Sequence, residues 1–138
     1  MQTSERFEQL IAFFESQLPR PVEQQPGDNG SIVFIGGAPP EVVVHLTATS
    51  VVVSEFACVW ESEEHVTVQP RRVGLVRWRR LPEDALLAAL SALVRGARQA
   101  RLARYATCRC CGERNPPEWL YDDDLCQRCA DEQRDVVH

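Results

Sequence analysis

The sequence predicts an α+β fold: an N-terminal helix, an antiparallel β-meander of about five strands, a long helix and a C-terminal module built around four cysteines. Three observations predict it. Apolar residues recur at three- and four-residue steps near the start of the chain and again after residue 82, as in amphipathic helices. Valine-rich runs lie between these segments, with gaps too short for a crossover helix, so neighbouring strands should pair antiparallel. Two closely spaced pairs of cysteines follow the second helical segment.

The length of 138 residues and the hydrophobic content of 44% suit one domain with a small appendage. We divide the chain into an α+β domain, residues 1–106, and a cysteine-rich module, residues 107–138, which we call the finger. No apolar run approaches the roughly 18 residues of a membrane span, so no membrane association is expected. Charged residues at positions 5, 6 and 8 replace the apolar stretch of an export signal, and we expect a cytoplasmic location.

The first helix is predicted over residues 4–18, because its apolar residues fall on one stripe of a helical surface: Phe7, Leu10, Ile11, Phe14 and Leu18. Pro19 and Pro21 end it, and residues 27–30 continue a polar connector to the next segment.

Five strands are predicted from valine- and isoleucine-rich runs separated by turn residues: Ser31–Ile35, Glu41–Thr47, Val51–Trp60, His65–Gln69 and Val73–Arg79. In the third and longest run we expect one set of alternate side chains to face the core: Val52, Phe56, Cys58 and Trp60. The fourth run alternates cleanly, which predicts a sheet with one wet face and one face covered by helix.

The second helix is predicted from Pro82 to about Tyr105, with an apolar face that spans its first four turns. Arg101 and Arg104 continue the same face, so we expect the last two turns to leave the domain as a stalk. With Arg95 and Arg98 they recur every third residue and spread over half the helix circumference. This arginine collar suits either phosphate groups or the carboxylates of the finger or of an acidic partner.

The finger contains two C-x2-C pairs, Cys108 with Cys111 and Cys126 with Cys129, separated by fourteen residues. Two cysteines three residues apart on a tight turn can bind one ion from the same side, and this spacing predicts a four-thiolate, tetrahedral site. Gly112 after the first pair suits a turn that requires positive φ. We expect one structural Zn²⁺. Iron remains an alternative, although Ala130 follows the second pair where a rubredoxin-like turn has glycine.

Cys108 to Asp135 resembles the four-cysteine zinc fingers of the DksA and TraR group of bacterial transcription factors: a long helix enters, C-x2-C-G forms the first knuckle, and Asp124-Leu125-Cys126 opens the second. The resemblance implies a zinc ribbon or treble clef with the same four cysteines as ligands. A strand-rich domain replaces the coiled coil of that family, so its role in the polymerase channel is not implied. Between the knuckles, Trp119 is expected to cover the metal site, or alternatively to dock a partner.

Charge is segregated along the chain. Residues 1–70 contain ten acidic residues and two arginines, residues 71–114 eleven arginines and three acidic residues, and residues 115–138 seven acidic residues and two arginines. All basic residues are arginine, which is typical of a GC-rich bacterial genome. The sequence pI near 5.2 disfavours broad binding to nucleic acid.

Four thiolates leave a metal ion no open position, and the finger has no histidine that could act as a base, so no enzymatic activity is expected. We therefore expect a small adaptor or regulator that binds another protein through the finger or the open sheet face. The alternative is a nucleic-acid-binding transcriptional regulator that uses the arginine-rich helix and the finger.

Overall fold

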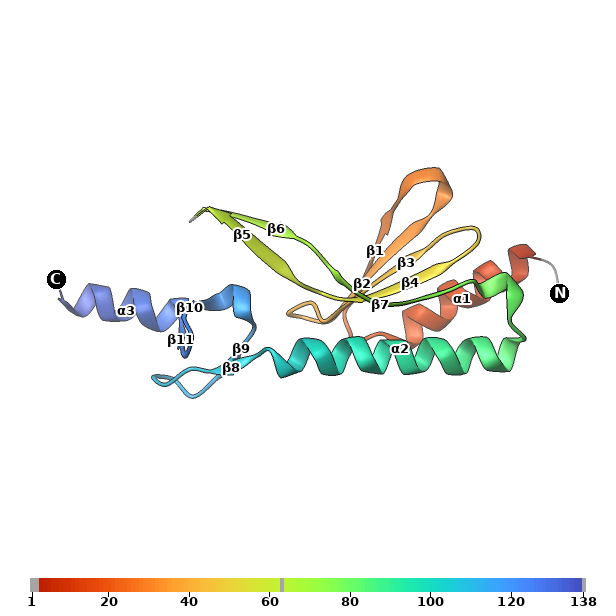
Figure 1. The fold of residues 1–138 in the computed structure, drawn as a ribbon. Coiled ribbons are helices and arrows are strands. Elements are labelled where there is room, and N and C mark those ends of the chain that lie inside the picture. The colour runs from red at the N-terminus through yellow and green to blue at the C-terminus, as the bar shows by residue number, and fades with distance from the viewer. Residues whose placement is uncertain (1–2, 63, 138) are drawn as a thin grey trace.

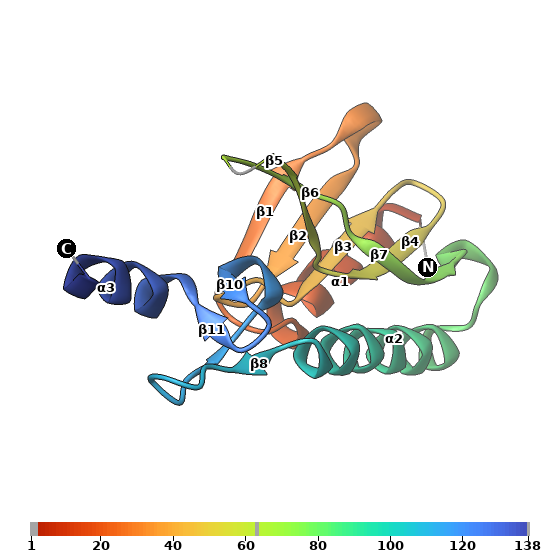
Figure 2. The ribbon, with the colours of Figure 1, turned by 60° about the vertical axis from the view of Figure 1, so that its left-hand side comes forward.

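The computed structural model describes residues 3–62 and 64–137 (Figures 1 and 2). The elements in chain order are α1 (Thr3–Gln17), β1 (Val22–Pro26), η1 (Asp28–Gly30), β2 (Ile32–Gly36), β3 (Val42–Leu46), β4 (Val51–Glu55), β5 (Cys58–Ser62), β6 (His65–Val68), β7 (Arg71–Val76), η2 (Trp78–Arg80), α2 (Glu83–Ala103), β8 (Ala106–Thr107), β9 (Arg114–Asn115), η3 (Pro117–Trp119), β10 (Leu120–Asp122), β11 (Leu125–Cys126) and α3 (Gln127–Val137).

The main sheet has five strands in the order β1-β2-β3-β4-β7, and every neighbouring pair is antiparallel. Both α1 and α2 lie against one face of this sheet, and the opposite face has no helix over it (Figure 1). This two-layer arrangement confirms the predicted α+β class and the order of helix, meander, helix and cysteine module. Within the described residues, no helix combines the length and the hydropathy of a membrane span.

The core forms between the two helices and the sheet, as the helical stripes predict. Leu10 and Phe14 of α1 meet Phe34 of β2, while Leu90 of α2 and Trp78 of η2 fill the space towards the other edge of the sheet. The indole N–H of Trp78 donates to the backbone oxygen of Thr47 at 3.0 Å, so its burial leaves no unpaired donor.

The predicted inward-facing set of the third run is only partly confirmed: Phe56 is buried, whereas Trp60 is 45% exposed. Val51 and Val53 are fully buried in the core, whereas Val52 lies on the open face. The single long strand expected here is two strands, because the chain bends at Phe56 and Ala57 between β4 and β5. Valines occupy three consecutive positions, so hydrophobicity alone does not determine which alternate set faces inwards.

The strands that form the main sheet also differ from those predicted. The connector expected after Pro21 contains β1, a polar edge strand that pairs with β2. The predicted fourth strand, β6, leaves the main sheet and pairs only with β5 in a separate hairpin. We call β5 and β6 the arm. It connects the end of β4 to the start of β7 and projects from the side of the sheet away from α2 (Figure 1).

Two glycines give a matched test of this packing. A β-carbon on Gly36 would lie 2.9 Å from the backbone oxygen of Pro19 and 3.0 Å from the β-carbon of Leu18. Gly36→Ala is therefore expected to lower the free energy of unfolding by about 1–3 kcal/mol, since the backbone must move. Gly96 lies inside α2 with its nearest contact, Val73 Cγ1, at 3.8 Å. Gly96→Ala should raise the free energy of unfolding by about 0.5–1 kcal/mol.

Denaturant unfolding of the two variants measures both effects. Equal changes of the same sign would contradict the close approach of β2 to the end of α1.

Candidate metal centre

The first cysteine pair lies on a tight turn between β8 and β9. The amide of Gly112 donates to the oxygen of Cys108 at 2.9 Å, and the amide of Cys108 donates to the oxygen of Glu113 at 2.9 Å. Gly112 has φ of 76°, a conformation that a side chain would disfavour. The glycine therefore closes the turn that brings Cys111 back towards Cys108, as its place after the pair predicts.

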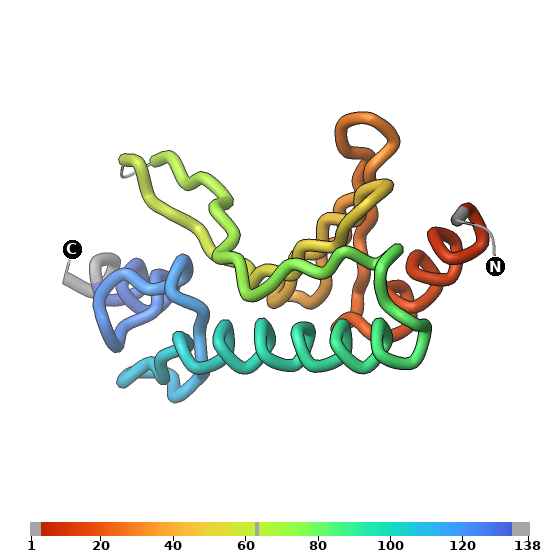
Figure 3. Tube along the Cα trace, turned by 45° about the vertical axis from the view of Figure 1, so that its right-hand side comes forward, coloured from red at the N-terminus to blue at the C-terminus, as the bar shows by residue number. Residues whose placement is uncertain are grey.

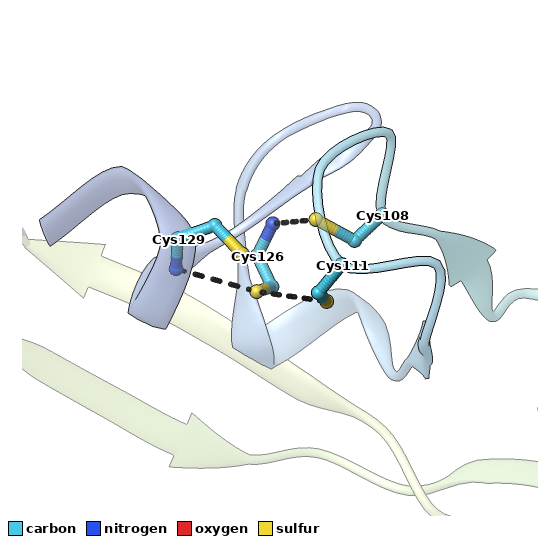
Figure 4. A group of neighbouring side chains, drawn as sticks. All are labelled: Cys108, Cys111, Cys126 and Cys129. Carbon is cyan, nitrogen blue, oxygen red and sulfur yellow. Dashed lines mark hydrogen bonds between the residues drawn. The ribbon is translucent and has the colours of Figure 1, made fainter. Parts of the chain in front are cut away.

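The second pair lies where a short hairpin runs into a helix. Cys126 ends β11, which pairs with β10, and Cys129 is in the first turn of α3. The amide of Cys129 lies 3.5 Å from the Sγ of Cys126, so the start of the helix points a donor at a sulfur. A hairpin followed at once by a helix holds both thiols on the side that faces the first turn (Figure 4).

The four predicted ligands converge. The Sγ atoms of Cys108, Cys111, Cys126 and Cys129 all lie within 4.8 Å of one another. Cys111 Sγ and Cys126 Sγ are 3.9 Å apart. A tetrahedral ion with metal–sulfur bonds of about 2.3 Å requires sulfurs separated by roughly 3.8 Å. The four sulfurs therefore lie close enough together to bind one tetrahedral metal ion.

Backbone amides surround the sulfur of Cys108. Those of Cys110 and Cys126 lie 3.4 and 3.5 Å from it. Hydrogen bonds from the backbone, the largest from Cys126, lower the pKa of the Cys108 thiol to about 6. The hydrogen bond with Cys126 and burial raise the pKa of the Cys129 thiol. The position of Cys108 thus favours the thiolate, which is the form of cysteine that binds a metal ion.

The finger has its own small core, formed by Cys108, Leu125, Cys126, Cys129 and Ala130. Trp119 is not part of this core. Its side chain is 50% exposed, so the expectation that it covers the metal site as a lid is wrong. Asn115 and Pro116 are buried in the loop instead. Trp119 forms one wall of a surface cavity of about 250 Å³ that also borders Asn115 and Arg128.

Two cysteines lie outside the metal cluster, as predicted. Cys110 is exposed, and the side-chain amide of Gln133 donates to its sulfur at 2.8 Å. Cys58 begins β5 and is half-buried rather than part of the core. Burial and the negative charge of Glu118 raise the pKa of the Cys58 thiol.

The arginine collar makes ion pairs with three different segments. Arg98 pairs with Glu41 at 3.2 Å and Arg104 with Glu55 at 2.9 Å, both at the edge of the α+β domain. Arg101 pairs with Glu118 of the finger through both nitrogens of its guanidinium end. Arg95 is exposed.

Arg101 corrects the prediction that the last two turns of α2 leave the domain. Its side chain is among the most buried of the described residues, with 1% of the residue exposed. Its Nε donates to the oxygen of Pro40 at 3.0 Å, and its guanidinium lies over the rings of Phe56 and Tyr105. Helical periodicity places Arg101 on the buried face, and the pair with Glu118 agrees with the alternative in which the collar binds carboxylates of the finger; only the end of burial at this residue is wrong.

Comparison of the chain with protein-family models, curated proteins and solved structures finds no match. The chemistry of the metal centre therefore rests on the four sulfurs and the backbone that positions them.

Proposed function

We propose that the protein is a zinc-binding, non-enzymatic adaptor or regulator that binds another protein through the arm and the adjoining face of the finger. One observation carries this proposal: the arm presents an apolar face to solvent beside the finger. The finger supplies a rigid support for that surface, because a four-thiolate site fixes a loop that has little core of its own.

Zinc is the metal we assign to the cluster. Four thiolates at tetrahedral spacing suit Zn²⁺ and leave no open position, so the ion would hold the finger together rather than bind a substrate. Ala130 after the second knuckle is unlike a rubredoxin-type iron site. The resemblance of Cys108 to Asp135 to the DksA and TraR zinc fingers supports the same metal and a ribbon or treble-clef arrangement.

The apolar face of the arm consists of cross-strand partners that lie on one side of the ribbon. Trp60 pairs with Val66, and Cys58 pairs with Val68. Trp60, Val66 and Val68 are 45%, 43% and 50% exposed. A two-stranded ribbon is marginally stable alone in water, and uncovered aromatic and branched side chains of this kind are typical of protein-binding surfaces.

Exposed carboxylates flank this surface at the tip of the arm and on the finger, while Arg72 is exposed at the base of the arm. Glu61 and Glu64 lie at the tip of the arm, and Asp122 and Asp123 follow Trp119 on the finger; none of the four forms an ion pair within the described residues. A partner that covers the apolar face therefore needs basic groups at its rim.

A photo-reactive amino acid at position 66 tests the proposal in cells, with the same group at Arg80 as a matched exposed control on η2. We expect one discrete protein to be cross-linked from position 66 and not from position 80. With that partner purified, Trp60→Ser should weaken the complex at least tenfold in a calorimetric titration, since half-exposed aromatic residues are frequent binding hot spots. Equal labelling from both positions would contradict the proposal.

Nucleic-acid binding is expected to be weak. Three arginines of the collar already pair with carboxylates, so few cations remain for phosphates. We predict that binding of a fluorescent DNA or RNA 20-mer disappears by about 0.2 M salt, as a few phosphate contacts require. A sequence-selective complex that persists at that salt, and weakens in Arg95→Ala, would support the transcriptional regulator instead.

A further inference from the structure

Arg101 connects three segments that are far apart in the sequence. From α2 it donates to Pro40 in the loop before β3 and to Glu118 in η3 of the finger. Its guanidinium also lies 5.2 Å from the centre of the Phe56 ring. The α+β domain, the root of the arm and the finger therefore meet at one buried cation.

Phe56 marks the point where the arm leaves the main sheet, between the end of β4 and the start of β5. Its amide donates to the oxygen of Glu41 at 3.0 Å. On the other strand, the amide of Gln69 donates to the oxygen of Ala57 at 2.8 Å. The first hydrogen bond extends the pairing of β3 with β4, and the second joins the two sides of the arm at its base. The guanidinium of Arg101 lies over the Phe56 ring, so the cation contacts the residue at which the arm leaves the sheet.

The charge of Arg101 is balanced from the finger. Burial lowers the pKa of the guanidinium, but hydrogen bonds and the charge of Glu118 outweigh burial and raise it above its ordinary value. Both partners are shielded, with side-chain exposures of 2% for Arg101 and 13% for Glu118. A buried cation that loses its carboxylate is strongly unfavourable, so it draws water to itself or moves outwards. Either response disturbs Phe56.

The position of Glu118 depends on the metal cluster. Glu118 lies in η3, in the loop between the two knuckles, and both ends of that loop are anchored by thiols of the site. The finger continues from the C-terminal end of α2, and the arm leans from the main sheet towards the same side (Figure 3); η3 packs against β5. Closure of the four-cysteine site thus determines whether the carboxylate reaches Arg101.

We propose that Arg101 and Glu118 form a metal-controlled latch: the metal-loaded finger holds the base of the arm closed, and loss of the metal releases it. The latch would control the orientation of the arm, the surface that we propose binds a partner. Its biological role therefore rests on the proposed function, but its physical behaviour does not. With the metal bound, Glu118 neutralises Arg101, Phe56 stays packed, and the apolar face of the arm is held in one orientation. Without the metal, η3 is free to move, Arg101 is hydrated, and the arm swings on the chain at Phe56 and Ala57.

Amide hydrogen exchange of the full-length protein tests the latch without any partner. We expect the amides of Phe56 and Gln69 to exchange at least tenfold faster after chelation than in the zinc-loaded protein. The zinc-loaded Glu118→Ala variant should show the same acceleration, although its metal remains bound. Core amides of β2 and β3, whose packing involves no residue of the finger, should remain slower than these two amides in both cases, because the base of the arm opens without unfolding of the domain.

Glu113→Ala is the matched control, since Glu113 is also a finger glutamate but pairs with Arg128 at the surface. Its exchange at the base of the arm should equal that of the unaltered protein. If Glu118→Ala fails to retain zinc, Arg101→Met removes the latch from α2, outside the finger, and should accelerate the same two amides.

Unchanged exchange at Phe56 and Gln69 in a zinc-loaded latch variant would overturn the proposal. So would further acceleration of these amides when the zinc-loaded Arg101→Met variant is chelated, because the metal would then act by another route. Neither result bears on the photo-cross-linking from position 66, so the latch and the proposed function are tested independently.

Discussion

Replacing Cys126 with serine is expected to unfold the finger and to abolish stoichiometric zinc binding. Cys126 ends β11, and its sulfur lies 3.9 Å from that of Cys111, so the substitution removes a ligand at the centre of the cluster. Structural zinc contributes on the order of 10 kcal/mol or more to the folding of such modules. The small core of the finger cannot replace it, because three of its five residues are themselves ligands. Elemental analysis of protein prepared without chelator, together with circular dichroism, measures both effects.

Cys110→Ser provides the control for this substitution. Cys110 lies next to the cluster but is exposed and contributes no sulfur to it, so the variant should bind one zinc per chain. Full zinc occupancy in Cys126→Ser, or an absence of metal from the unaltered protein, would contradict the assignment of the site.

The metal site was the most predictable part of the molecule. A ligand set defined by two C-x2-C pairs depends on local turns, and a local turn is encoded by few residues, such as Gly112. The helices were predictable for a similar reason, since a stripe at helical spacing identifies both the element and its buried face. Leu10 and Phe14 occupy the core as their spacing predicts.

The features that the sequence did not disclose depend on contacts between distant segments. Valines on both faces of β4 left its phase open, and the polar residues of β1 gave no sign of an edge strand. The burial of Arg101 depends on Glu118, seventeen residues away, and on Pro40, which is further still. The sequence offers two signals, an arginine on the apolar face of a helix and carboxylates in the finger that could pair with it. The arginine indicates either the end of the buried segment or a paired cation, and the position of the carboxylate decides between them.

The position of the arm was likewise not predictable from its sequence pattern. Its alternation of apolar and polar residues satisfies the pattern of a half-buried strand, which is why β6 was expected in the main sheet. A strand that covers a core and a strand that leaves its apolar face exposed carry the same pattern of alternating residues. The exposure of Trp60 and Val68 therefore reflects what the fold leaves uncovered and not a defect of the pattern.

A chain that ends at residue 106 is expected to keep a cooperative fold without metal. The core of the α+β domain is formed by α1, α2 and the sheet, and it shares no residue with the core of the finger. Its free energy of unfolding should nevertheless fall, because Arg101 loses Glu118. Breaking a buried pair costs about 3–5 kcal/mol, and solvent that enters beside Phe56 after truncation reduces that cost.

Arg101→Met in the shortened chain separates the two contributions. Methionine keeps the apolar stem and removes the charge, so it should raise the free energy of unfolding by about 1–3 kcal/mol relative to the shortened chain with arginine. Arg95→Met on the same helix is the control; Arg95 is exposed, and its replacement should change stability by less than about 0.5 kcal/mol. Urea unfolding measures the free energy of unfolding of the full-length chain, of the shortened chain and of its two methionine variants. Loss of cooperative unfolding in the shortened chain would show that the α+β domain does not end at residue 106. An equal increase in the free energy of unfolding from both methionines would show that Arg101 needs no partner once the finger is removed.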